Sequence, residues 1–318
     1  MSEAKINIQQ YCNFVKGYII PQTPKGFGAS VVNSFKYGLS DDEIETGITA
    51  FREMLYKLFD TIAKFKGDES AIKKDYKKKY EKNDYRRYTD VLNHLAWILY
   101  RIGQAELETK PSIRLVGKVE NYFLVYKAGV YELDERHREV YLLLTGLGFR
   151  FSSIDLTKNE KFTGSDTFVV EHEDISIIIG TKLMAAALDN TKDNSIKPHN
   201  TIMRCDFTPL ANEKISALKL CIHDFIRSLP LQAREWIVDI DDWLAENGCK
   251  AESKKDNLST DTTFIYTTVK GKKKVEVCRV FISVHGCSMS ISGDTYPIDE
   301  ETDFEKLRGY IELDFRAL

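Results

Sequence analysis

The chain has 318 residues, 43% hydrophobic and 29% charged, with a net charge of −3, which is typical of a globular protein of two or three domains. Only 7 Pro and 18 Gly exclude long low-complexity sequence. No apolar run reaches the ~18 residues of a membrane helix, and the start of the chain resembles no signal peptide. The six cysteines lack tight spacing and are expected to be reduced thiols. We therefore expect a cytoplasmic protein that does not enter a membrane.

The first third of the chain is predicted to be α-helical. After a short helix over 5–20, Ser40 and Glu43 form a capping box that opens a helix running to about Phe65. Further helices are expected over 69–82 and 85–106, and Pro111 marks the end of this segment. Two heptad stripes lie on these helices and should pack against each other. Their members are Ile44, Ile48, Phe51, Leu55, Leu58, Ile62 and Phe65, then Tyr88, Leu92, Leu95, Leu99 and Ile102.

Strand-forming sequence dominates after Pro111. The predicted fold is α+β, with a helical domain over 1–111 and α+β units over 112–209 and 210–318 that carry mainly antiparallel sheets. The second α+β unit is a candidate distant repeat of the first, because helix, glycine, strand, loop and strand follow in the same order. Strands are expected at 113–116, 122–126, 149–154, 166–171, 175–181, 201–207, 262–269, 274–284 and 287–292. Helices are expected at 135–146, 211–228, 232–246 and 301–314.

The most basic stretch of the chain is residues 73–87, with a local charge of +5. Tyrosines alternate with the cations, and cations beside aromatic rings suit a phosphate backbone with exposed bases. A solvated helical face with internal ion pairs is the alternative interpretation. The candidate nucleic-acid-binding residues are Lys73, Lys77, Lys78, Tyr80, Arg86 and Arg87.

A glycine turn follows Pro24 and is a candidate phosphate-binding loop. Lys25, Gly26, Gly28 and Ser30 could hold an anion with backbone N–H groups and one cation. The Walker signature is missing, and no strand precedes the turn as a dinucleotide fold requires. An ordinary turn therefore remains the alternative.

The last hundred residues hold a candidate metal site. Cys278, His285 and Cys287 lie on neighbouring predicted strands, with Cys249 as a further candidate, and thiolates with imidazole are zinc ligands. The paired C-x-x-C spacing is absent, so buried structural thiols are the alternative. The same residues would also suit a Cys–His nucleophile pair.

Two acidic stretches admit similar alternatives. The run 171–174 could bind a cation or serve acid–base chemistry, but a polar hairpin turn explains it equally. Asp239, Asp242 and Glu246 line the outer face of an amphipathic helix, where solvation is the expected role.

The leading functional hypothesis is a non-enzymatic binding or regulatory protein with a protein partner or small ligand and no cofactor. The heptad stripes could also support a homodimer. The second hypothesis is nucleic-acid binding through 73–88. The third is an enzyme or metal protein that uses Cys249, Cys278, His285 and Cys287.

Overall fold

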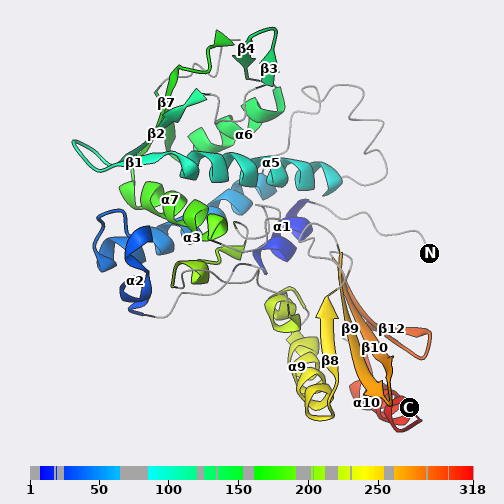
Figure 1. Ribbon diagram of the computed structural model, residues 1–318. Coiled ribbons are helices and arrows are strands. Elements are labelled where there is room, and N and C mark those ends of the chain that lie inside the picture. The colour runs from blue at the N-terminus through cyan, green and yellow to red at the C-terminus, as the bar shows by residue number, and fades with distance from the viewer. Residues whose placement is uncertain are drawn as a thin grey trace. The chain divides into compact units, whose positions relative to one another are not determined.

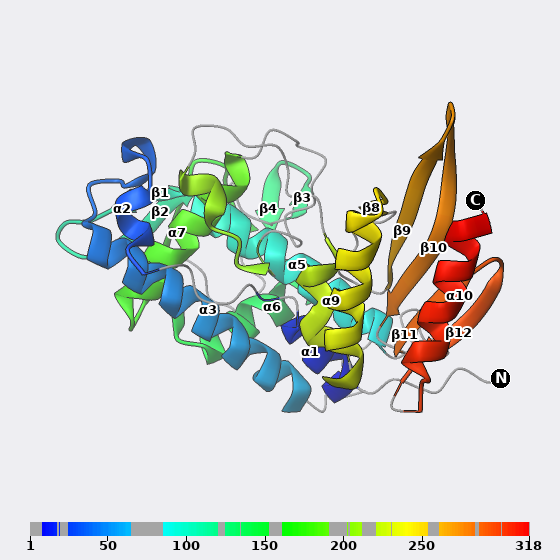
Figure 2. The same cartoon turned by 90° about the horizontal axis from the view of Figure 1, so that it is seen from below.

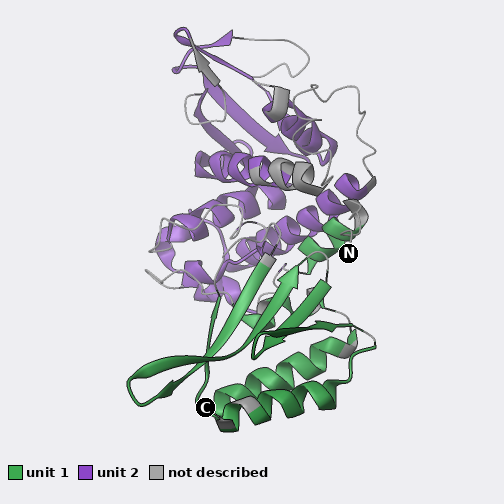
Figure 3. Ribbon diagram, turned by 90° about the vertical axis from the view of Figure 1, so that its right-hand side faces the viewer, with its two compact units in different colours: residues 1–18, 218–318 green, residues 19–217 purple. Residues whose placement is uncertain are grey.

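The computed structural model divides the chain into two compact units (Figure 3). Unit 2 is Ile19–Ala217, and unit 1 combines Met1–Tyr18 with Leu218–Leu318. The expected boundary at 111/112 falls inside unit 2, so independent folding of three domains stays a prediction. The residues described are 8–17, 19, 25–64, 85–119, 125–133, 135–152, 161–190, 202, 204–211, 221–229, 231–253, 261–283, 286–299 and 301–317.

Helices form the core of unit 2, and α7 lies at its centre. The stripe residues of α3 and α5 that are described, such as Ile44 and Leu99, are buried. We expected α3 and α5 to pack against each other, but both helices pack chiefly against α7 (Figure 1). The helices of unit 2 are α2 (Phe27–Ser30), α3 (Asp41–Lys64), α5 (Tyr85–Gln104), α6 (Glu135–Gly146) and α7 (Ile175–Asp189), with short 3₁₀ turns η1 (Asn33–Phe35) and η4 (Thr208–Ala211).

The expected strand at 175–181 is wrong, because these residues begin α7. Three consecutive isoleucines favour a strand by composition, but the Asp174 carboxylate caps a helix by accepting from the Ser176 N–H. The apolar sequence also continues to Leu188, and a helix that is apolar on all sides must be buried. The length of the run, rather than its residue types, distinguishes the two structures.

Glycines set how closely these helices approach. A Cβ on Gly180 of α7 would lie 2.2 Å from the carbonyl oxygen of Gly47 on α3. A Cβ on Gly103 of α5 would lie 2.4 Å from the carbonyl oxygen of Thr181. Both distances are far below van der Waals contact. Because Gly180 and Gly103 have no side chain, the backbone of α7 can approach the backbones of α3 and α5 closely.

Two small antiparallel sheets complete unit 2. One has the order β1-β2-β7-β5 and the other β3-β4-β6. Helix α6 packs on the first sheet, where the Tyr141 ring meets Phe151 and Phe168 edge to face or nearly so. The strands are β1 (Glu106–Glu108), β2 (Arg114–Lys118), β3 (Val125–Lys127), β4 (Val130–Glu132), β5 (Phe149–Phe151), β6 (Lys161–Phe162) and β7 (Thr167–His172).

Unit 1 is built on one five-stranded antiparallel meander with the order β12-β11-β10-β9-β8. Helices α9 and α10 lie side by side on one face of this sheet, joined by the ring pairs Trp236–Phe304 and Trp243–Phe315 (Figure 2). Its elements are α1 (Ile8–Lys16), η5 (Ile222–Ser228), α9 (Leu231–Glu246), β8 (Lys250–Ser253), β9 (Asp261–Lys270), β10 (Lys273–Ser283), β11 (Gly286–Ile291), β12 (Asp294–Ile298) and α10 (Phe304–Ala317).

The α+β fold class and its N-terminal helical region are confirmed. The strand expected at 201–207 is wrong, since the described residues there include no strand; Asp206 accepts from the Thr208 N–H and leads into η4. Within the helix expected at 211–228, the described part from Ile222 is the 3₁₀ helix η5. The helix expected at 69–82 lies outside the described residues. Strands β1, β4, β6 and β12 were not predicted, and β8 was expected only as the strand after the glycine of the second candidate repeat.

The two candidate repeats share a local path. In each, a helix ends at a glycine of positive φ, Gly148 or Gly248, and enters a strand that pairs antiparallel with the next long strand. The chain then diverges, because β7 leads into α7 whereas β9 turns back into β10. Duplication stays a prediction. In the part of the chain that the structure describes, no helix has both the length and the apolar character needed to cross a bilayer.

Candidate functional site

The basic segment lies largely outside the described residues. This applies to the positions Lys73, Lys77, Lys78 and Tyr80. Arg86 and Arg87 belong to the first turn of α5, but their side chains are not among those described. Nucleic-acid binding through 73–88 therefore stays a prediction.

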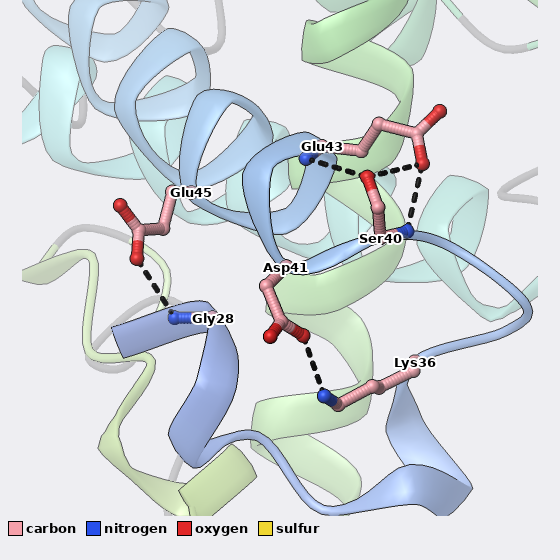
Figure 4. A network of polar contacts seen from close by, with 6 residues as sticks. All are labelled: Gly28, Lys36, Ser40, Asp41, Glu43 and Glu45. Carbon is pink, nitrogen blue, oxygen red and sulfur yellow. Dashed lines mark hydrogen bonds and ion pairs between the residues drawn. The ribbon is translucent and has the colours of Figure 1, made fainter. Parts of the chain in front are cut away.

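The glycine turn at Gly26 already holds an anion of the protein itself. Gly26 has φ +84° and precedes the one-turn helix α2, and the Gly28 N–H donates to Glu45 Oε1 at 3.2 Å (Figure 4). A Cβ on Gly28 would lie 2.2 Å from the Asp41 carbonyl oxygen. This glycine thus fits the close approach of α2 to α3, and one donor that a phosphate would need is occupied. Lys25 and Ser30 are exposed beside it.

The capping box at the start of α3 has the predicted geometry. The Ser40 N–H donates to Glu43 Oε2 at 2.7 Å, and the Glu43 N–H donates to Ser40 Oγ at 3.3 Å (Figure 4). The Lys36 ammonium pairs with Asp41 at 2.6 Å on the same turn. Hydrogen bonds from the backbone and hydroxyl of Ser40 lower the pKa of Glu43. These polar groups bond to one another at the start of α3, so their role is to stabilise the helix start.

The thiols of the predicted metal site are buried and apart. Cys278 pairs with Ile291, whereas Cys287 pairs with Ile282, so the two thiols lie four positions apart along the sheet, about 13 Å. Burial raises the pKa of Cys287 to about 12 and also raises the pKa of Cys249. His285 lies outside the described residues, so the complete three-residue site stays a prediction.

The acidic run 171–174 comprises the end of β7 and the residues that lead into α7. His172 is buried, its Nδ1 accepts from the Asp174 N–H at 2.9 Å, and its Nε2 lies 2.8 Å from the Leu147 carbonyl oxygen. Asp174 is the N-cap of α7. The histidine therefore joins two segments of unit 2, and the run links β7 to α7 rather than forming a hairpin turn.

A polar cluster at the end of α7 was missed by the sequence analysis. The Lys182 ammonium donates to the Ala105 carbonyl oxygen at 2.7 Å and lies 4.9 Å from the Tyr37 ring centre. The Tyr100 hydroxyl donates to Asp189 Oδ1 at 2.5 Å. Burial lowers the pKa of Lys182, while burial and the hydrogen bond to Asp189 raise that of Tyr100. Both hydrogen bonds join α7 to α5 or to the residue that follows it, so the cluster fastens α7 to the end of α5.

The end of the β9–β10 hairpin is different, because it presents its charges to solvent. Strand β8 pairs with β9 only as far as Thr267, and β11 pairs with β10 only from Cys278. Residues 268–277 therefore form a two-stranded ribbon beyond both neighbours, as Figure 2 shows. We call its exposed end the lysine tip. It comprises Val269, Lys270, Gly271, Lys272, Lys273 and Lys274.

The lysine tip has two features that do not help folding. Lys270 and Lys273 occupy directly opposed positions, where like charges destabilise a strand pair. Val269, the residue before Lys270 in β9, is 70% exposed. The Lys274 ammonium makes an ion pair with Glu252 at 2.7 Å, but both partners are exposed. The result is an exposed apolar side chain on a projecting ribbon that also carries four cations.

A second group that the sequence analysis missed lies in unit 1, where His223 of η5 meets α9. His223 Nε2 lies 2.8 Å from Asp241 Oδ2, and the buried Tyr266 hydroxyl donates to Asp241 Oδ1 at 2.7 Å. Asp242 brings a further carboxylate oxygen within 4.8 Å of the other two ligand atoms. From the sequence, Asp242 was assigned to a solvated stripe, because the separation of 18 positions between His223 and Asp241 gives no spacing signal.

Comparisons with protein-family models, with curated proteins and with solved structures found no match to this chain. A function for this protein must therefore be inferred from the surfaces described above.

Proposed function

We propose that the chain is a non-enzymatic binding protein of the cytoplasm that engages a protein partner with an acidic surface through the lysine tip. The observation that carries this proposal is the exposed Val269 among Lys270, Lys272, Lys273 and Lys274 on a ribbon that extends beyond its neighbouring strands. An apolar core within a polar rim is the usual composition of a protein interface. Rim charges of one sign raise the association rate with an oppositely charged partner.

A protein partner suits the tip better than nucleic acid does. Single-stranded nucleic acid is typically held by aromatic stacking as well as by cations. The tip has no aromatic residue. All six cysteines, each within the described residues, are thiols rather than disulfides, which supports a reducing compartment.

The test is quantitative capture from cell extract with the full chain as bait. The double variant Lys270→Glu/Lys273→Glu changes the charge of the tip by −4, and Lys57→Glu/Lys118→Glu makes the same change at two exposed positions of unit 2. We expect wild type and the unit 2 variant to retain an acidic protein that high salt releases. The tip variant should retain it at least about tenfold less, because like-charge contacts across an interface cost several kcal/mol. Equal retention by both variants would contradict the proposal.

Nucleic-acid binding through 73–88 is the second candidate, supported by the local charge of +5. It predicts an affinity for oligonucleotides that falls steeply with salt. Charge reversal at Lys77, Lys78 and Arg86 should abolish the binding measured by fluorescence anisotropy. Unchanged affinity would remove this candidate.

The homodimer expected from the heptad stripes also stays a proposal. The described stripe residues are buried within unit 2, so a dimer would have to use another surface. Sedimentation of the full chain at several concentrations would measure its association.

A further inference from the structure

The His223–Asp241–Asp242 group of unit 1 has the residue types of a metal site. One ligand atom from each side chain can be chosen so that all three lie within 4.8 Å of one another. The group combines an imidazole nitrogen with two carboxylates, a donor set that suits zinc and similar divalent cations. Calcium and magnesium prefer oxygen ligands alone.

The central carboxylate is already oriented from behind. Tyr266 is 2% exposed, and its hydroxyl donates to one oxygen of Asp241, leaving the other oxygen toward the partly exposed imidazole. Metal-binding carboxylates are commonly held by such outer hydrogen bonds.

The positions of Asp241 and Asp242 add a second argument. Neighbouring residues of a helix point about 100° apart, yet a carboxylate oxygen of each lies within 4.8 Å of the same imidazole nitrogen. Two carboxylates at such a separation repel each other even in water. A bound divalent cation would replace this repulsion with attraction to both.

We propose that His223, Asp241 and Asp242 bind a single divalent transition-metal cation, zinc being the best match. Ligand atoms around a tetrahedral zinc lie about 3.3 Å apart, given bonds of about 2.0 Å. His223 and Asp241 would separate slightly from their 2.8 Å contact, and the exposed Asp242 side chain would move inward. The solvent side leaves a position for water. This inference is independent of the lysine tip.

Isothermal titration calorimetry of the chelator-treated full chain with Zn²⁺ tests the proposal, and Co²⁺ absorption reports the ligand geometry. Asp242→Asn and His223→Gln remove one ligand each. Asp239→Asn is the matched control, because this residue is exposed on the same helix but does not belong to the group. Cys287→Ser tests the thiol site predicted from the sequence.

We expect wild type, Asp239→Asn and Cys287→Ser to bind one equivalent. Asp242→Asn and His223→Gln should bind at least about tenfold more weakly, the loss seen even for outer-shell changes at metal sites. Three results would overturn the inference: no binding by wild type, equal binding by all variants, or loss of binding in Cys287→Ser alone. The first would identify the group as a hydrogen-bonded link between η5 and α9. None of them bears on partner capture by the lysine tip.

Discussion

The lysine tip of unit 1 and the polar cluster on α7 of unit 2 use their charged groups in opposite ways. In unit 2, Lys182 bonds to the end of α5 and Tyr100 to the end of α7, so even the charged side chains serve packing. In unit 1, Lys270 and Lys273 face each other on a ribbon that leaves its sheet. Charge that opposes folding is better evidence of an interaction surface than charge that supports it. The predictions below test this contrast, in decreasing order of expected effect.

The largest effect is expected at the centre of unit 2. Gly180→Ala places a Cβ 2.2 Å from the Gly47 carbonyl oxygen, so α7 and α3 must separate. We expect the free energy of unfolding to fall by about 3 kcal/mol or more, as for severe overpacking. Chemical denaturation measures the change.

Gly309→Ala in α10 of unit 1 is the matched control, because nothing lies within 4 Å of its added Cβ. It should raise the free energy of unfolding by up to about 1 kcal/mol through helix propensity. Equal losses in both variants would contradict the assignment of close helix contact to Gly180.

The next effect is expected at alkaline pH. Burial raises the pKa of Cys287 to about 12 in the folded chain, whereas an unfolded thiol has a pKa of about 8.5. The stability contributed by keeping this thiol neutral is complete below pH ~8.5 and is lost as the pH rises towards ~12. Between those values it falls by about 1.4 kcal/mol per pH unit.

Denaturation of wild type and Cys287→Ala from pH 7 to 10.5 isolates this contribution. The variant should show the shallower alkaline decline, while Cys221→Ala, at an exposed position, should follow wild type. Identical slopes for Cys287→Ala and wild type would show that this thiol titrates normally.

A smaller effect is expected at the start of α3. Ser40→Ala removes the hydroxyl that accepts from the Glu43 N–H and should lower the free energy of unfolding by about 1 kcal/mol. Ser30→Ala, at an exposed position of α2, should change it by less than about 0.5 kcal/mol. Thermal unfolding compares the two. A loss no greater than that of Ser30→Ala would mean that the cap contributes little.

The smallest effect on stability is expected at the lysine tip. Lys273→Glu replaces a like-charge pair with an opposite pair across the ribbon, so stability should rise by a few tenths of a kcal/mol. High salt should remove the gain, because the pair is exposed. A loss above about 1 kcal/mol would indicate that Lys273 has a folding role, which would weaken its assignment to a binding surface.

Local signals predicted much of the fold. The Ser40–Glu43 box, helix α6 and the β9–β10 hairpin follow from capping chemistry, helical period and a glycine turn, all of which act within a few residues. Helix α7 was missed because three consecutive isoleucines favour a strand, whereas the length of the apolar run, which continues to Leu188, indicates a helix. Residue type alone could not place it.

The candidate sites depended on contacts that sequence spacing does not encode. His223 and Asp241 meet only because η5 packs on α9. The two strands that flank Gly271 were predicted, but the exposure of the lysines between them follows from where β8 and β11 stop pairing, which only the folded sheet shows. Conversely, the predicted thiol pair is separated by strand register.

The most direct test of the contrast is photo-crosslinking in living cells, with a photoreactive amino acid at position 269 of the lysine tip or at Leu142. Leu142 is exposed on α6 of unit 2 and serves as the reference. We predict that position 269 crosslinks to an acidic protein and that Lys270→Glu/Lys273→Glu removes the product. Crosslinking to nucleic acid, or no protein crosslink above that at position 142, would contradict the proposal that the lysine tip binds a protein.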